Sequence, residues 1–112
     1  MYQIEAVVKP QKLNDVVEGL TEIGIVGMTA VEVNGYGRQK GVTETYRGSE
    51  YKVRFIPKAL VKVVVKNSDL EKAIKTIQDK ARTGEIGDGK IFVSKLENVI
   101  RIRTGETGEG AI

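Results

Sequence analysis

Residues 60–93, LVKVVVKNSDLEKAIKTIQDKARTGEIGDGKIFV, carry the pattern that decides the fold of this chain of 112 residues. The β-branched run over 60–66 predicts a strand. Apolar residues then recur at helical spacing, and they are Leu70, Ala73, Ile74 and Ile77. Ser68 and Glu71 have the spacing of a capping box at the start of this helix. A second strand is expected over 90–94, which completes a strand–helix–strand unit.

The same pattern occurs once before in the chain. Alternation of apolar and polar residues over 2–9 predicts a strand with one buried face, and 28–36 reads as another strand. The stripe of a helix lies between them, formed by Leu13, Val16, Val17, Leu20 and Ile23. Gly24 and Gly84 are expected to end the two helices. A last strand is expected over 99–103.

Two strand–helix–strand units in series require a right-handed crossover in each. The economical arrangement is an α+β fold, a ferredoxin-like double βαβ sandwich with four strands and both helices on one face. The other face of the sheet must then be covered or solvated. Its apolar content predicts that subunits pack against each other there.

Composition narrows the possible functions. The chain is 29% charged and 40% hydrophobic, which is typical of one globular domain. It has no cysteine and no histidine, so thiolate chemistry and the commonest general base are excluded. A net charge of +3 suits small anions or nucleic acid. No signal peptide pattern and no run of about 20 apolar residues is present, so we expect a cytoplasmic protein.

A long connection, residues 37–55, joins the two halves of the predicted fold. Connections longer than about 12–15 residues are usually functional or disordered. Alternation of Tyr51, Val53 and Phe55 with Lys52 and Arg54 also allows a β-hairpin arm. An exposed arm of either kind is suited to binding other proteins.

A second candidate element is the glycine-rich segment 82–91, which leads from the second helix into a strand. Its glycines allow backbone amides to bind an anion, and Lys90 adds a cation. It nearly matches a Walker A motif, but Ile91 replaces the Ser or Thr and the order of helix and strand is reversed. An ordinary turn after a helix remains the alternative.

Arg101 and Arg103 are two residues apart in the strand expected over 99–103. In a strand both side chains would project from one face, about 7 Å apart. Two fixed guanidinium groups suit a polyphosphate. A solvated edge strand that carries protective cations is the alternative.

Four segments together resemble the signature sequences of the PII family of nitrogen-regulatory signalling proteins. They are GYGRQKG at 35–41, YRGSEY at 46–51, TGEIGDGKIFV at 83–93 and VIRIRTGE at 99–106. The resemblance covers the chain from its first strand to its last residues. It implies one PII domain over 1–112, with a long regulatory loop at 37–55, a nucleotide loop at 82–91 and a terminal strand and tail at 99–112.

The resemblance also implies a homotrimer in which ATP and ADP compete for clefts between subunits. One subunit would contribute Gly35, Gly37, Arg38, Gln39, Gly87, Asp88, Gly89 and Lys90. Its neighbour would contribute Met28, Thr29, Arg101 and Arg103, with Val64 near the adenine. 2-Oxoglutarate would bind beside ATP and Mg²⁺, which Gln39 would ligate. Lys58 would pair with the distal carboxylate, and the remaining contacts would come from the backbone near Gly37, Lys40, Gly41 and Gly87.

The same resemblance makes the 37–55 loop the output element. Tyr51 matches the uridylylation site of the family, and Ser49 matches a serine that is phosphorylated in cyanobacterial relatives. The expected partners are an ammonium channel, regulatory enzymes of glutamine synthetase, a nitrogen-sensing histidine kinase or acetylglutamate kinase. Membrane association would occur only through the channel. Lys62 departs from the glutamate that many relatives carry, which puts the balance of ATP and ADP affinity in question.

Two other functions fit this sequence less well. A nucleic-acid-binding domain of this fold would stack bases on surface aromatic residues, but the chain has only four Tyr and two Phe. A nucleotide-binding enzyme is also poorly supported, because no obvious base accompanies the glycine-rich segment. Weak ATPase activity stays open as the alternative to a purely regulatory role.

Overall fold

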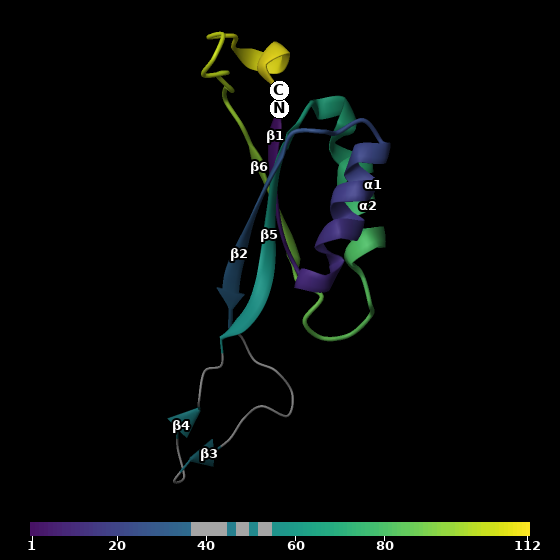
Figure 1. The fold of residues 1–112 in the computed structure, drawn as a ribbon, viewed down its shortest axis with the longest axis vertical. Coiled ribbons are helices and arrows are strands. Elements are labelled where there is room, and N and C mark those ends of the chain that lie inside the picture. The colour runs from purple at the N-terminus through teal and green to yellow at the C-terminus, as the bar shows by residue number, and fades with distance from the viewer. Residues whose placement is uncertain (37–44, 47–49, 52–54) are drawn as a thin grey trace.

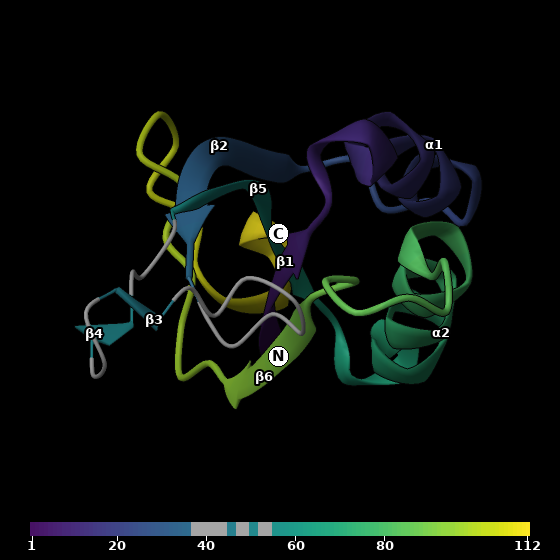
Figure 2. The same ribbon diagram turned by 90° about the horizontal axis from the view of Figure 1, so that it is seen from below.

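The computed structural model describes residues 1–36, 45–46, 50–51 and 55–112. A four-stranded sheet has the order β2-β5-β1-β6, and all neighbouring strands in it are antiparallel. Both helices cover one face of this sheet (Figure 1; Figure 2). The elements are β1 (Tyr2–Val8), α1 (Leu13–Glu22), β2 (Met28–Gly35), β5 (Ile56–Val65), α2 (Leu70–Ala81) and β6 (Lys90–Lys95). The expected ferredoxin-like α+β fold is therefore confirmed.

Short elements lie between and beside these. Two-residue strands β3 (Thr45–Tyr46) and β4 (Glu50–Tyr51) pair with each other as a small separate sheet. The 3-10 turns are η1 (Pro10–Lys12), η2 (Asn67–Asp69) and η3 (Gly108–Ala111). The pairing of β3 with β4 agrees with the hairpin alternative, although residues 52–54 of the expected alternation lie outside the described part.

The core lies between the sheet and the helices. Alternate residues of the two central strands are buried on the helix side, and they are Ile4, Ala6, Val8, Ala59, Val61, Val63 and Val65. They pack in one cluster with Val16 and Leu20 of α1 and Ala73 and Ile77 of α2. Each fully buried Val, Leu or Ile side chain of this cluster contributes roughly 1.5–3 kcal/mol through removal of apolar area from water.

The end of α1 follows from Gly24, whose φ is 89°. The amide of Gly24 donates to the carbonyl oxygen of Thr21 at 3.0 Å, and that of Ile25 donates to Leu20 at 3.0 Å. This pair of bonds is a Schellman motif, in which glycine supplies the left-handed residue. The predicted stop at Gly24 is confirmed.

The expectations for α2 were less accurate. Gly84 lies three residues beyond the last helical residue, Ala81, and belongs to the following loop. The predicted capping box of Ser68 and Glu71 is wrong, because neither η2 nor α2 has a side-chain cap hydrogen bond. The turn before α2 is held differently, since the N-terminal ammonium group donates to Asn67 Oδ1 at 2.6 Å.

β5 begins at Ile56 rather than at Leu60, where the β-branched run starts. The first residues of β5 pair with β2 alone, because β1 ends at Val8, which lies opposite Ala59. Pro57 is tolerated there because that stretch has a partner strand on one side only. Because of this proline, the sequence pattern did not indicate that the strand begins at Ile56.

The predicted strand over 99–103 is wrong. The chain turns at 102–104, and Ile100 makes a single antiparallel bridge with Thr107. The amide of Arg101 donates to the carbonyl oxygen of Glu106 at 2.9 Å, and Gly105 donates back to Arg101 at 2.8 Å. Because these backbone groups are satisfied within the tail itself, no ladder to the main sheet forms. Arg101 and Arg103 therefore do not share one strand face.

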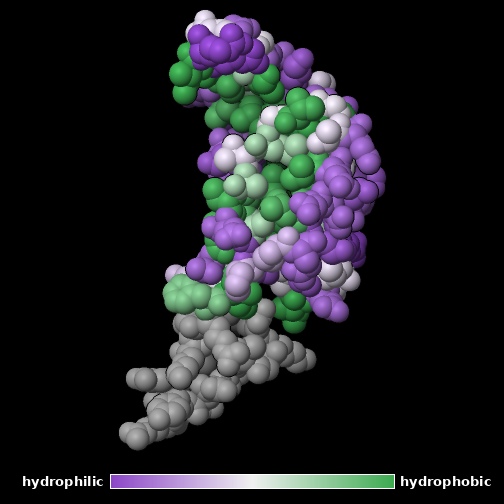
Figure 3. Space-filling view, in the orientation of Figure 1, coloured by the Kyte–Doolittle hydropathy of each residue, from purple (hydrophilic) through white to green (hydrophobic). Residues whose placement is uncertain are grey.

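The face of the sheet away from the helices is open (Figure 2). On it Leu60 lies between Val7 of β1 and Val31 of β2, while Phe92 lies opposite Glu5. Val31 is 48% exposed and Phe92 55% exposed. In space-filling view hydrophobic residues gather over the sheet and hydrophilic ones over the helices (Figure 3). Among the described residues, no helix is both long and apolar enough to cross a membrane.

Candidate functional site

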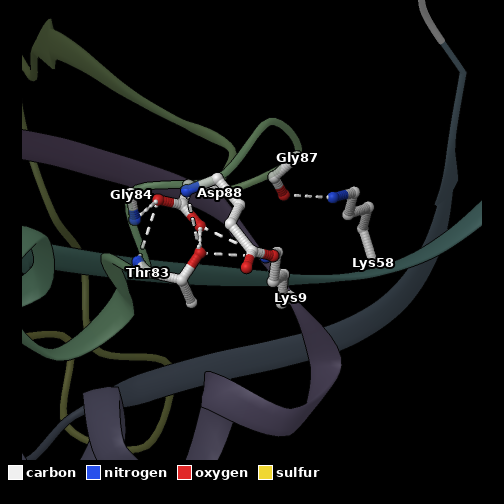
Figure 4. A network of polar contacts seen from close by, with 7 residues as sticks. Lys9, Lys58, Thr83, Gly84, Gly87 and Asp88 are labelled. Carbon is white, nitrogen blue, oxygen red and sulfur yellow. Dashed lines mark hydrogen bonds and ion pairs between the residues drawn. The ribbon is translucent and has the colours of Figure 1, made fainter. Parts of the chain in front are cut away.

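Three of the predicted site residues meet at one end of the sheet. β2 ends at Gly35, β5 begins at Ile56 opposite it, and the loop that follows α2 lies at the same end (Figure 1). The ammonium group of Lys58 donates a hydrogen bond to the carbonyl oxygen of Gly87 (Figure 4). Gly35 lies against the stem of Lys58, since a Cβ atom on Gly35 would be 3.2 Å from Lys58 Cγ. Gly35, Lys58 and Gly87 thus form one contact group.

The loop after α2 has a backbone that requires glycine. Gly84, Gly87 and Gly89 have φ values of 88°, 101° and 100°. These angles are rare for residues that carry a Cβ atom. Successive turns of this kind leave amides free to face an anion. Lys90 begins β6 directly after the loop, opposite Val7.

Asp88 is turned into its own loop (Figure 4). Its Oδ2 accepts the amides of Thr83 at 2.9 Å and of Gly84 at 2.8 Å, and its Oδ1 accepts the Thr83 hydroxyl. Lys9 Nζ lies 3.4 Å from Asp88 Oδ1 and donates to Thr83 Oγ1 at 3.0 Å. The Thr83 hydroxyl, followed by these amides and Lys9, holds the pKa of Asp88 well below its ordinary value, although partial burial acts the other way.

A second group of predicted residues lies at the opposite end of the sheet. Met28 begins β2 opposite Val63, and Thr29 follows opposite Lys62. Val64 lies opposite Gln3, near the start of β1. The tail leaves the sheet at this end too, since the amide of Leu96 donates to the carbonyl oxygen of Met1 at 3.0 Å. In Figure 1 the tail and the 82–89 loop are accordingly at opposite ends.

Arg101 is held by its own tail at that end. Its Nη1 donates to Glu106 Oε1 at 3.2 Å, and its Nη2 donates to the carbonyl oxygen of Ile112 at 3.3 Å. Arg103 is exposed at the turn. Glu106 and the terminal carbonyl therefore fix the position of the Arg101 guanidinium group within the tail.

The two groups of residues are far apart within one copy of the chain. Met28 and Gly35 are the first and last of the eight residues of β2, which rises about 3.3 Å per residue, so they lie roughly 23 Å apart. Residues of both groups cannot surround one phosphate chain in a single copy. A shared site would need the second group from another copy.

Several predicted residues lie outside the described part of the structure, namely Gly37, Arg38, Gln39, Lys40, Gly41 and Ser49. Tyr51 is described only through its pairing with Thr45. Within the described ranges no group of three or more acidic, histidine or cysteine residues could hold a metal ion. The role of Gln39 as a ligand of Mg²⁺ stays a prediction, because Gln39 lies outside the described residues.

Sequence reasoning missed the contacts of Lys9 and Thr83. The two residues are 74 positions apart, and only the fold shows that the end of β1 reaches the loop after α2. Within the loop a weak signal was present, because Asp88 follows two glycines in a turn and an aspartate in a turn commonly accepts backbone amides.

The chain was compared with known proteins. The pattern of the family described as "Nitrogen regulatory protein P-II" matches residues 1–106. A "Nitrogen regulatory protein P-II" of Pasteurella multocida is 56% identical, and one of Azospirillum brasilense is 57% identical. The "Nitrogen regulatory protein P-II 1" of Escherichia coli is 54% identical. Each alignment covers 100% of both chains.

Proposed function

Because this chain belongs to the nitrogen regulatory protein P-II family, we propose that it binds ATP or ADP together with 2-oxoglutarate at sites shared by two copies of the chain. In this role it is a cytoplasmic sensor of nitrogen, carbon and energy status. It acts through the 37–55 segment on ammonium transport and on enzymes of nitrogen assimilation.

One observation carries the proposal. The loop with Gly87, Gly89 and Lys90 lies at one end of the sheet, and Met28 and Arg101 lie at the other. In a closed ring of copies every interface is heterologous, so one surface of each copy meets a different surface of the next, and residues from the two ends can contribute to one shared site. A homotrimer is such a ring, and the half-exposed apolar residues of the open sheet face suit its interior.

The chemistry of the loop fits a phosphate chain. Gly89 cannot carry a side chain, because a Cβ atom there would overlap the carbonyl oxygen of Val7, so the loop backbone lies directly against β1. Lys90 supplies a point charge beside the loop amides. Arg101 and Arg103 of a neighbouring copy would add planar donors for phosphate oxygens. Arg101 would have to exchange Glu106 for the ligand.

The hydrogen bond between Lys58 and Gly87 links the two proposed ligand sites. 2-Oxoglutarate carries two carboxylates, and an ammonium group is a suitable partner for one of them. Lys58 would transfer from the Gly87 carbonyl oxygen to that carboxylate, within reach of the nucleotide loop. With Mg²⁺ held by ATP and Gln39 as the second attachment point, each ligand would favour binding of the other.

The signal would pass to other proteins through the 37–55 segment, which joins β2 to β5 directly beside this site. Its targets would include an ammonium channel and either regulatory enzymes of glutamine synthetase, a nitrogen-sensing histidine kinase or acetylglutamate kinase. Uridylylation of Tyr51 or phosphorylation of Ser49 would add charge to the segment and change which partners bind. A role as an enzyme with weak ATPase activity is the alternative, and the names of the relatives support it less.

Calorimetric titration tests the proposal. 2-Oxoglutarate is titrated into the protein with and without Mg-ATP, and ATP is titrated alone. We expect ATP to bind alone and 2-oxoglutarate to bind only when Mg-ATP is present. Binding of 2-oxoglutarate that is independent of ATP would contradict the shared site, and a chain with no affinity for ATP or ADP would refute the proposal as a whole.

A further inference from the structure

We propose that Asp88 and Lys9 are positioning residues for the phosphates: they hold the loop over 83–89 in its binding shape before a nucleotide arrives, and Asp88 acts through the loop rather than by contact. The inference rests on the proposed nucleotide site. It assigns a role to Lys9, which the sequence motifs do not include, and changes the role of Asp88 from ligand to support.

The geometry of the carboxylate is the first argument. Asp88 accepts both amides at the start of the loop, at 2.9 Å from Thr83 and 2.8 Å from Gly84, and it also accepts the Thr83 hydroxyl. These bonds close the loop from its sixth residue, Asp88, back to its beginning. The amides of Thr83 and Gly84 are thereby used, which leaves amides later in the loop for a ligand.

Lys9 connects this closed loop to the sheet. It follows Val8, the last residue of β1, and its ammonium group contacts both Thr83 Oγ1 at 3.0 Å and Asp88 Oδ1 at 3.4 Å. Its side chain is only 16% exposed, so it is fixed rather than solvated. Lys9 thus links the loop to the end of β1 through contacts with Thr83 and Asp88, which are far from it in the sequence (Figure 4).

A charge argument separates Asp88 from the residues that would touch the ligand. A carboxylate next to a triphosphate is repelled by it, so direct contact would weaken binding. Three glycines with positive φ also make the loop costly to order on binding. A carboxylate that orders the loop beforehand removes that cost and strengthens binding. We therefore expect loss of Asp88 to weaken binding of phosphates, although it removes a negative charge.

Three variants test this. Asp88→Asn keeps the size of the side chain but removes one hydrogen-bond acceptor and the ion pair with Lys9. Lys9→Met removes the ammonium group that contacts Thr83 and Asp88. Glu85→Gln is the matched control, because it removes the same charge from the same loop while its side chain is 82% exposed and 3.8 Å from Lys9. All three are checked for folding by circular dichroism.

Two measurements are made. Calorimetry gives the affinity for Mg-ATP, and chemical-shift titration gives the affinity for AMP, which lacks the two outer phosphates. We expect Asp88→Asn to weaken ATP binding by about tenfold or more, and Lys9→Met by about threefold, as typical for loss of charged hydrogen bonds. Glu85→Gln should stay within about twofold, and AMP affinity should change little in every variant. Equal losses for ATP and AMP, or unchanged ATP binding in Asp88→Asn, would overturn the proposal.

Hydrogen exchange of the ligand-free protein separates this inference from the proposed function. The amides of Thr83 and Gly84 should be protected in the unaltered chain and exchange faster in Asp88→Asn. Unchanged exchange in the variant would refute the holding role whether or not nucleotide binds. If the unaltered chain bound no ATP, the proposed function would fail and the positioning role would fail with it, while the exchange result would still report on the loop.

Discussion

A Cβ atom on Gly89 would lie 1.7 Å from the carbonyl oxygen of Val7. No residue other than glycine can occupy this position without movement of the backbone, and its φ of 100° adds a second reason. The close approach of the loop to β1 also brings Asp88 within reach of Lys9, one residue beyond the strand. The contact between Gly89 and Val7 thus sets the position of the loop that we assign to phosphate binding.

The first prediction compares two glycines of this loop. Gly84 also has a positive φ, of 88°, but a Cβ atom there would meet nothing within 4 Å. Gly84→Ala should therefore lower the free energy of unfolding only by the cost of a positive φ at a residue with a Cβ atom, about 1–2 kcal/mol. Gly89→Ala should lower it clearly more and abolish ATP binding. Thermal unfolding followed by circular dichroism measures the difference. Equal effects of the two substitutions would show that the overlap with Val7 does not matter.

The second prediction concerns Lys58. Lys58→Ala removes the ammonium group that now binds the carbonyl oxygen of Gly87. We expect calorimetry to detect no 2-oxoglutarate binding in this variant, while ATP affinity stays within a fewfold of that of the unaltered chain. Lys66→Met, which removes an exposed lysine just beyond the other end of β5, is the control. Similar losses of both ligands in Lys58→Ala would contradict the separate role of this lysine.

The third prediction concerns Lys62, which lies between Glu5 of β1 and Thr29 of β2 on the open face. Lys62→Glu would place like charges directly opposite each other and should destabilise the fold by roughly 0.2–1 kcal/mol. Glu5→Lys combined with Lys62→Glu restores an opposite pair and should recover most of that loss. Urea unfolding of the single and double variants measures the coupling. Additive effects would mean that the two side chains do not interact.

The fourth prediction is a pH dependence. Hydrogen bonds from Thr83 and Gly84 and the charge of Lys9 lower the pKa of folded Asp88 below its ordinary value of 3.8. A lowered folded pKa favours the folded state above pH 3.8, and this contribution is lost as pH falls from 3.8 toward the folded value. Asp88→Asn should therefore lower stability at pH 7 and flatten its decline below pH 4. If the decline of stability below pH 4 were the same in Asp88→Asn as in the unaltered chain, the carboxylate of Asp88 would not be held as described.

The sequence was sufficient for the layers and topology of this fold because its periodic segments are regular. The alternation of residues 2–9 and the stripe that contains Val16 and Leu20 gave the buried faces of β1 and α1 correctly. Gly24 ended α1 as its position indicated. Local pattern and tertiary structure agree at these positions, which is typical of a foldable sequence.

The sequence was not sufficient to predict contacts between residues that are far apart in the chain. The alternation of Ile100 to Arg103 looked like a strand, but the tail folds back on itself and satisfies the amide of Arg101 through Glu106. Ser68 and Glu71 had the spacing of a capping box, yet the N-terminal ammonium group, 66 residues away, binds Asn67 instead. The contacts of Lys9 were not predicted for the same reason, because Thr83 and Asp88 follow α2, far from Lys9 in the sequence.

The central claim is that one site takes residues from two copies, and mixed assemblies test it most directly. Lys90→Ala should disable one half of every site, and the double variant Arg101→Gln/Arg103→Gln the other half. Each protein alone should bind no ATP. After joint refolding at equal amounts, random closed assemblies should recover about a quarter of the binding sites of the unaltered protein. No recovery in assemblies shown to be mixed would mean that each site is built from a single chain, and would contradict the account.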